Sequence, residues 1–89
     1  MTRWVRAPGV LWRETFDQVL LMVPDREELV SGNLCAAAVW DALGEMDDAD
    51  EIARLVEDTF GLDAPDADRD VLEALEQLRS CGAVVSHEQ

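Results

Sequence analysis

The sequence lacks most of the residues that enzymes and metal sites depend on. It has no lysine or tyrosine, its single histidine, His87, lies close to the C-terminus, and its two cysteines, Cys35 and Cys81, are far apart. No Cys/His spacing suits zinc, and no P-loop or nucleophile–base motif is present. The two thiols are therefore expected to be free and to pack as small hydrophobic groups. We expect no catalytic residue, no metal and no cofactor.

Long apolar runs are also missing. No stretch approaches the roughly 18 residues that a membrane-spanning helix needs, and the N-terminus has no apolar segment of the signal-peptide type. We therefore expect a cytoplasmic protein that does not contact membranes. A chain of 89 residues with 48% hydrophobic and 30% charged residues is expected to fold as a single domain, residues 1–89.

Positive charge is scarce. Seven arginines face 20 acidic residues, which gives a formal net charge of −13. Such a surface repels phosphate backbones, whose binding depends on positive side chains that displace counterions. The charge argues against nucleic acid and against anionic membranes as partners.

Three helices are predicted from periodicity and from capping residues. Asn33 and Asp48 suit the N-caps of the first two helices, and Asp66 or Asp68 that of the third. A glycine follows each helix at the position where a left-handed residue often ends one. The first helix is apolar almost all round, which predicts a central position, and the third has an apolar arc wider than one packing partner needs. The predicted helices are Leu34–Leu43, Ala49–Phe60 and Asp68–Cys81, ended by Gly44, Gly61 and Gly82.

Strands are predicted ahead of the helices. Residues 9–16 alternate partly between apolar and polar, residues 18–23 form an apolar run, and residues 27–31 read as a third strand. Val23–Arg26 resembles a type I turn with Pro24 at its second position. The segment 83–85 either forms a short closing strand or only packs. The fold class predicted is α+β and winged-helix-like: a small N-terminal three-stranded antiparallel sheet followed by three α-helices.

Several short strings, in this order, resemble the PqqD-like family, also called the RiPP recognition element. They are "LLMVP" (20–24), "GNLCAAAVW" (32–40), Gly44, "DEIARLVEDTF" (50–60) and "DVLEALEQLRSCGAVV" (70–85). Family members are non-catalytic chaperones that bind the leader segment of a ribosomally made precursor peptide and deliver it to a modifying enzyme. The sequence departs from the pattern at Gly32, where leucine often precedes the asparagine, at Leu34-Cys35 and at Ala83-Val84. The change at Gly32 is expected to loosen the register at the end of the third strand.

The resemblance implies that the leader adds as a strand to the free edge of the third strand and lies against the third helix. The physical basis is sound, because a short edge strand offers unpaired N–H and C=O groups. The wide apolar arc of the third helix is the expected wall for leader side chains, and an arginine at its rim is expected to meet a leader acid. The alternative is that the apolar arc only fills the core. The expected peptide-binding residues are Glu28, Leu29, Val30, Ser31, Val71, Leu72, Leu75 and Arg79.

Two other functions stay open. One is a winged-helix transcription regulator, although the surface of the third helix is acidic where DNA would need basic residues. The other is a protein–protein adaptor domain. Within the family, lasso-peptide members usually carry an aromatic-rich third strand, and because residues 27–31 contain no aromatic, the lasso class is not favoured.

Overall fold

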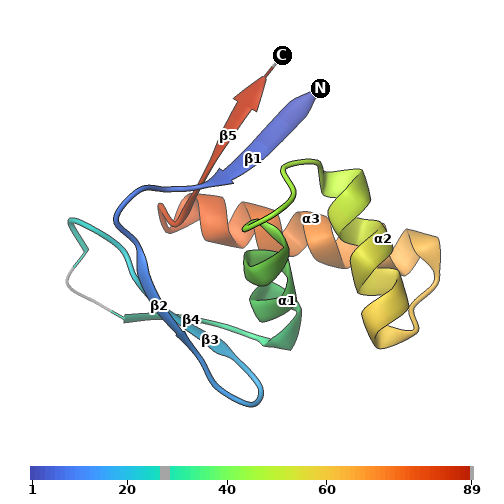
Figure 1. Cartoon of the computed structure of the whole chain (residues 1–89), viewed down its shortest axis with the longest axis horizontal. Helices are drawn as coiled ribbons and strands as arrows, with labels where there is room; N and C mark the ends of the chain where they lie inside the picture. Colours follow the sequence, from blue (N-terminus) through green and yellow to red (C-terminus); the bar gives the residue numbers. More distant parts are fainter. Residues whose placement is uncertain (27–28, 89) are drawn as a thin grey trace.

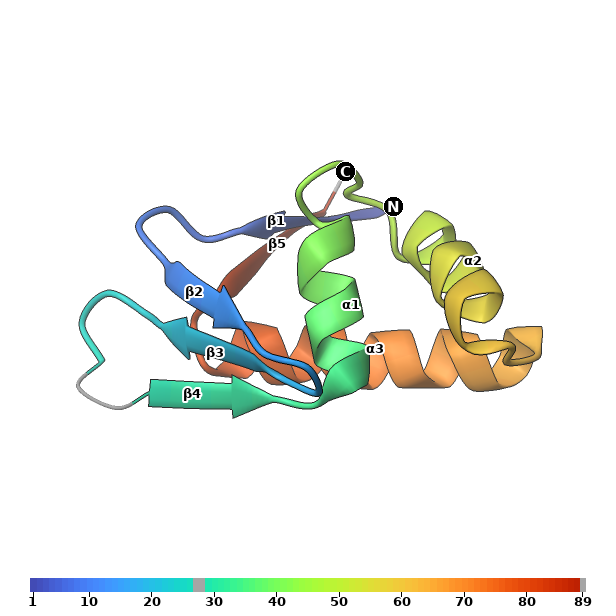
Figure 2. The same cartoon turned by 60° about the horizontal axis from the view of Figure 1, so that its bottom comes forward.

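The computed structural model describes residues 1–26 and 29–88 as five strands and three helices (Figure 1). The strands form two antiparallel sheets, one of β1 and β5 and one in the order β2-β3-β4. The helices stand between and beside the two sheets (Figures 1 and 2). The elements are β1 (Thr2–Arg6), β2 (Leu11–Glu14), β3 (Val19–Met22), β4 (Leu29–Gly32), α1 (Leu34–Ala42), α2 (Ala49–Phe60), α3 (Ala64–Ser80) and β5 (Val84–Glu88).

The three-stranded sheet confirms the α+β prediction. β3 lies in the middle, with Leu21 facing Val30 on one side and Trp12 on the other. The turn before β4 occurs at the predicted residues, and the Arg26 N–H donates to the Val23 carbonyl at 3.1 Å. Its type differs, because Asp25 has a φ of +70°, which is a feature of type II turns.

The sheet of β1 and β5 was only half predicted. The C-terminal segment does form a strand, β5, as one of the two alternatives expected. Its partner β1 was not predicted as a strand. The register pairs Thr2 with Glu88 and Arg6 with Val84, so the two ends of the chain lie side by side (Figure 1). The signal was the buried Trp4 in the alternating run "TRWVR", which is short and interrupted by arginines.

Two of the three helix ends follow the glycine rule. Gly61 and Gly82 have φ of +67° and +86°, but Gly44 is not in the left-handed region. The end of α1 is capped instead by Arg6, whose guanidinium donates to the Trp40 carbonyl from Nε at 3.1 Å and from Nη2 at 2.5 Å. A Cβ on Gly44 would lie 3.3 Å from that Nη2, so the residue leaves room for the arginine.

Helix α3 begins one turn earlier than predicted. Its N-cap is Asp63, in extended conformation, and Pro65 lies in the first turn, where a missing N–H is harmless. Asp66 and Asp68 therefore lie inside the helix and do not cap it. Residues 64–67, which the predicted helix left out, are thus also helical.

The core is built around α1, as its apolar sequence predicted. Trp40 is fully buried, and the Arg6 guanidinium lies 4.6 Å from its ring centroid and 4.7 Å from that of Trp12 in β2. The two tryptophans also meet edge to face, with centroids 5.5 Å apart. This cation–π and aromatic cluster attaches the three-stranded sheet to α1.

The junction of β4 with α1 has no loop. Gly32 is the last residue of β4, and the next residue, Asn33, accepts a hydrogen bond on its side chain from the Ala36 N–H at 2.9 Å. A Cβ on Gly32 would lie 2.7 Å from the Ala36 Cβ and 3.2 Å from Val19 Cγ1. The expected loosening of register does not occur, because Gly32 pairs directly with Val19.

We predict that Gly32→Ala destabilises the protein by about 1–3 kcal/mol, because the added methyl group overlaps rigid neighbours at a packed junction. For a domain of this size, each kcal/mol corresponds to a fall in Tm of about 4–8 °C. Thermal unfolding followed by circular dichroism measures the change, with Ser31→Ala as the matched control on the adjacent exposed residue. An unchanged Tm for Gly32→Ala would show that the close approach is not a constraint.

Candidate functional site

Strand β4 has an unoccupied edge. Within residues 1–26 and 29–88 its only sheet partner is β3 (Figure 2). In an antiparallel ladder, alternate residues direct their N–H and C=O groups toward the same neighbour. Two of the four β4 residues therefore direct these groups away from β3, where a further strand can pair with them.

The predicted β4 residues lie on both faces of this edge. Leu29 is 57% exposed and Ser31 is also exposed, both on the outer face of the sheet, whereas Val30 is half-buried and packs against the core. Glu28 lies outside the described residues. The edge position of β4 agrees with the expectation, and the role of these residues in peptide binding stays a prediction.

The predicted α3 residues do not form a wall beside β4. Val71 and Leu75 are 1% and 0% exposed and belong to the core, so they have no surface for a ligand. Leu72 is 47% exposed, but it lines a hollow with Trp4 and Glu88, on the side of β1 and β5. Arg79 is exposed and forms an ion pair with Glu76, which lines the same hollow.

The physical reason is that α3 packs against α1, α2 and β5, and these three partners use its wide apolar arc. The helix is turned so that a different stripe faces the start of α1. Together with the β4–α1 junction, this stripe lines a cavity of about 190 Å³. The lining residues are Asn33 and Cys35 from the junction and Asp70, Glu73, Ala74 and Gln77 from α3.

This cavity, which we call the junction groove, suits a side chain better than a small molecule, whose pockets are usually about 300–1,000 Å³. Sequence reasoning missed its α3 residues because acids on an amphipathic helix look like a solvent-facing side. The available signal was their spacing, since positions 70, 73, 74 and 77 recur at helical period next to the core positions.

The electrostatic environment of the junction groove is negative. Burial, with added repulsion from Asp70 and then Glu73, raises the pKa of the half-buried Cys35 thiol, whose Sγ lies 3.8 Å from the Asp70 carbonyl oxygen. The Asp70 carboxylate is 3.5 Å from Arg69. Among the described residues, no ion pair or hydrogen bond involves the Glu73 carboxylate.

Arg26 connects the turn before β4 to the far end of α3. Its Nη2 donates to the Ser80 carbonyl at 3.2 Å. Arg26 precedes β4, and Cys35, whose Sγ lies 3.8 Å from the Asp70 carbonyl oxygen, follows it closely. The chain therefore contacts α3 on both sides of the strand. The free edge of β4 is thus held in a fixed position relative to α3.

Neither a metal site nor a membrane-spanning helix is found among the described residues. No group of three or more His, Cys, Asp or Glu side chains in residues 1–26 and 29–88 is arranged to hold a metal ion. None of the helices in that part of the chain has the length and hydrophobicity to cross a membrane.

Comparison with known protein families gives one match. The family described as "Coenzyme PQQ synthesis protein D (PqqD)" matches residues 18–84, from just before β3 to the start of β5. The chain belongs to the PqqD family. The matched region contains β4, the junction groove and all of α3. No curated protein matches this PqqD-family chain.

Two solved structures share the fold. The first, "TbiB1 in Complex with the TbiA(beta) Leader Peptide", has a TM-score of 0.81 and 18% identity, covering 96% of this chain and 99% of the other. The second, "Lasso peptide synthetase B1 complexed with the leader peptide", has a TM-score of 0.78 and 18% identity, covering 93% and 98%. The likeness extends over nearly the whole chain, beyond the residues of the family match. At this identity it establishes the fold and does not select a product class.

We predict that Cys35 titrates above the ordinary range of a cysteine, since its pKa is raised. In a Cys81→Ser background, its alkylation rate should be low at neutral pH and rise only in the alkaline range. Glu73→Gln should lower the pKa of Cys35 and speed alkylation at a given pH, whereas Glu76→Gln, one turn further along α3 and not among the residues that line the groove, should not. A Cys35 thiol that titrates at or below the ordinary value would contradict the description of a buried, negative groove.

Proposed function

We propose that this chain binds the leader segment of a ribosomally synthesised precursor peptide and delivers it to a modifying enzyme of the same pathway. The leader adds as a strand to the edge of β4 and places side chains in the junction groove. The chain itself performs no catalysis, and it acts in the cytoplasm, where precursor and enzyme meet. The unpaired edge of β4, held beside α3, is the observation that supports this proposal most strongly.

Strand addition suits a leader because main-chain bonds tolerate many sequences, while pockets select particular side chains. Two alternate residues of β4 supply the main-chain partners, and Cys35 and Ala74 lie in the groove that receives a side chain. The direct junction of β4 with α1 keeps the edge rigid, which lowers the entropy lost when a flexible peptide is ordered. The two similar structures are complexes of those proteins with leader peptides, which agrees with this function.

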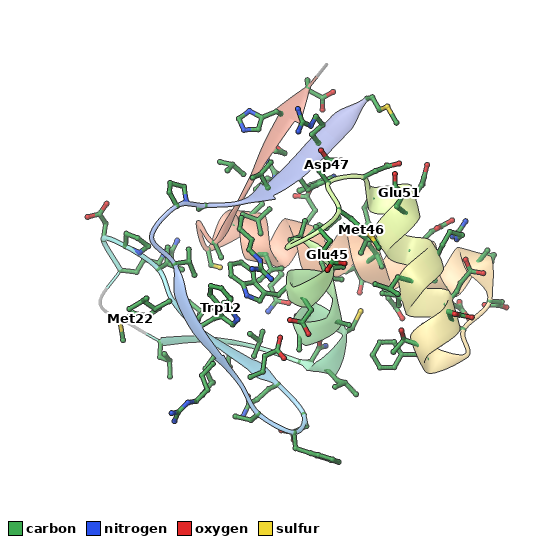
Figure 3. All side chains as sticks on the ribbon, in the orientation of Figure 1. Trp12, Met22, Glu45, Met46, Asp47 and Glu51 are labelled. Carbon is green, nitrogen blue, oxygen red and sulfur yellow. The ribbon has the colours of Figure 1, made fainter. Side chains whose placement is uncertain are left out.

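Delivery to an enzyme needs a second surface that stays free when the leader is bound. The outer face of the three-stranded sheet has such a surface, because Leu11, Met22 and Leu29 lie directly opposite one another across the strands. They are 67%, 54% and 57% exposed, and Figure 3 shows Met22 at the margin of the molecule, away from the helices. Arg13 is the one charged residue that the β2-β3-β4 register places on this face. An apolar partner surface with an acidic group opposite Arg13 fits it.

The first test is titration of the precursor peptide encoded beside this gene, with leader and core as separate peptides. The leader should bind with a Kd of micromolar or tighter, equivalent to about −8 kcal/mol or better. Leaders with a single N-methylated residue, which cannot donate a hydrogen bond at that position, should lose affinity at alternate positions, because every second N–H faces β4. Binding that depends only on the core, or an N-methyl pattern without a period of two, would contradict strand addition.

Two further measurements, DNA binding and enzyme binding, separate the other two functions from leader recognition. A transcription regulator would shift a DNA fragment in a gel at moderate salt, and a charge of −13 should prevent this. An adaptor would bind the enzyme encoded nearby but not the leader. Either result without leader binding would replace the proposed function.

The enzyme-docking surface has its own test. We predict that Met22→Asp leaves the Kd for the leader within about twofold but lowers the rate at which the neighbouring enzyme modifies the precursor by at least about tenfold, because it places a charge in an apolar contact. Leu55→Asp, on an exposed position of α2, is the matched control and should keep the full rate. Equal rates for both variants would remove the outer sheet face from the proposal.

A further inference from the structure

The junction groove has a chemical preference that the proposed function does not by itself specify. Its α3 side presents the carboxylates of Asp70 and Glu73, its floor includes Ala74, and Asn33 and Gln77 supply neutral polar groups. None of the described residues that line it is basic. Glu73 is exposed and, within the described residues, makes no ion pair, so its carboxylate is available to a ligand.

Resting on the proposed function, we propose that the bound leader carries a lysine or arginine opposite the β4–α1 junction, and that Glu73, with Asp70, selects it. The cation lies between the end of β4 and the middle of α3. Glu73 and Asp70 thus become specificity residues for the leader, in place of the apolar wall and Arg79 expected from the sequence.

The shape and lining of the groove favour a long basic side chain over other occupants. An aliphatic stem can lie against Ala74 and the Cys35 side chain while its charged head reaches the carboxylates, as lysine and arginine do on mixed surfaces. A leader acid would meet like charge from both carboxylates. A metal ion is a poor alternative, because the raised pKa of Cys35 leaves it a protonated thiol. In addition, the described part of the chain offers no third acidic or histidine ligand there.

The charge of the whole molecule acts in the same direction. A net charge of −13 attracts a basic peptide and repels an acidic one at distances of about a Debye length, roughly 8 Å at physiological salt. Arg26, at the other end of β4, is a cation that already donates to the Ser80 carbonyl. Of these charged groups, the Glu73 carboxylate in the junction groove is therefore the one that is available to pair with the leader.

The experiment uses the full-length protein and the leader of the precursor encoded beside it. Each lysine or arginine of the leader is replaced in turn by norleucine or citrulline, which keep the stem and remove the charge. One replacement should weaken binding by about tenfold or more, the scale of a charged hydrogen bond. Glu73→Gln should weaken the affinity for the native leader by a similar factor. Its affinity for the leader that lacks the selected charge should be only slightly lower than its affinity for the native leader. Glu76→Gln, a neighbouring acid that does not line the groove, is the matched control and should bind normally.

A charge exchange adds an independent measurement. Glu73→Lys should lose affinity for the native leader and regain part of it when the selected basic residue becomes glutamate. Circular dichroism and thermal unfolding establish that the variants fold, as expected for an exposed residue. A leader that binds well with all its basic residues neutralised, or equally well to Glu73→Gln, would overturn this inference and leave the proposed function intact. A leader that does not bind at all would overturn the proposed function itself.

Discussion

The close approach of β4 to α1 fixes the geometry of the site. Only a residue without a Cβ fits at position 32, because Ala36 and Val19 fill the space that a side chain would need. Asn33 begins the helix at the next residue by accepting from the Ala36 N–H. Strand β4 therefore continues directly into α1, the most buried helix, without a loop. Because α1 is packed in the core, the exposed edge of β4 is held rigidly.

The position of α3 follows from the same arrangement. With α1 fixed between the sheet and the other helices, α3 packs on α1, α2 and β5, and its apolar residues are used on those three sides. The stripe next to the apolar arc, with Asp70, Glu73 and Gln77, then faces the end of β4. The free edge of β4 and the acidic junction groove lie close together because α3 packs in the core with one side and lines the groove with the next.

The elements predicted well from sequence are those with strong local signals. Helix α2 has clear amphipathic periodicity and a capping aspartate, and it was predicted with its observed bounds. The turn at Pro24 and the three central strands were also identified. By contrast, β1 has only a weak local pattern, a short alternating run with two arginines, and it pairs with β5 at the other end of the chain. The end of α1 was misjudged at Gly44 because its cap, Arg6, comes from a distant part of the sequence.

The site was predicted only in part, for a related reason. The free edge follows from strand order, which the family resemblance supplied, whereas the rotation of α3 about its own axis depends on all its packing partners at once. An apolar arc wider than usual indicated more than one partner but not which side stayed open. Val71 and Leu75 proved to be core residues, Leu72 lies on the side of β1 and β5, and Arg79 pairs with Glu76. The acids that line the groove could not be told from ordinary solvated residues without that rotation.

The pairing of a peptide with β4 can be observed directly by amide hydrogen exchange of residues 29–32, measured by NMR with and without the leader. In the free protein, alternate amides should exchange fast because they point away from β3, and the others should be protected. Addition of the leader should protect the fast amides selectively. If the leader binds while those amides continue to exchange fast, the peptide does not add to this edge and the account of the site is wrong.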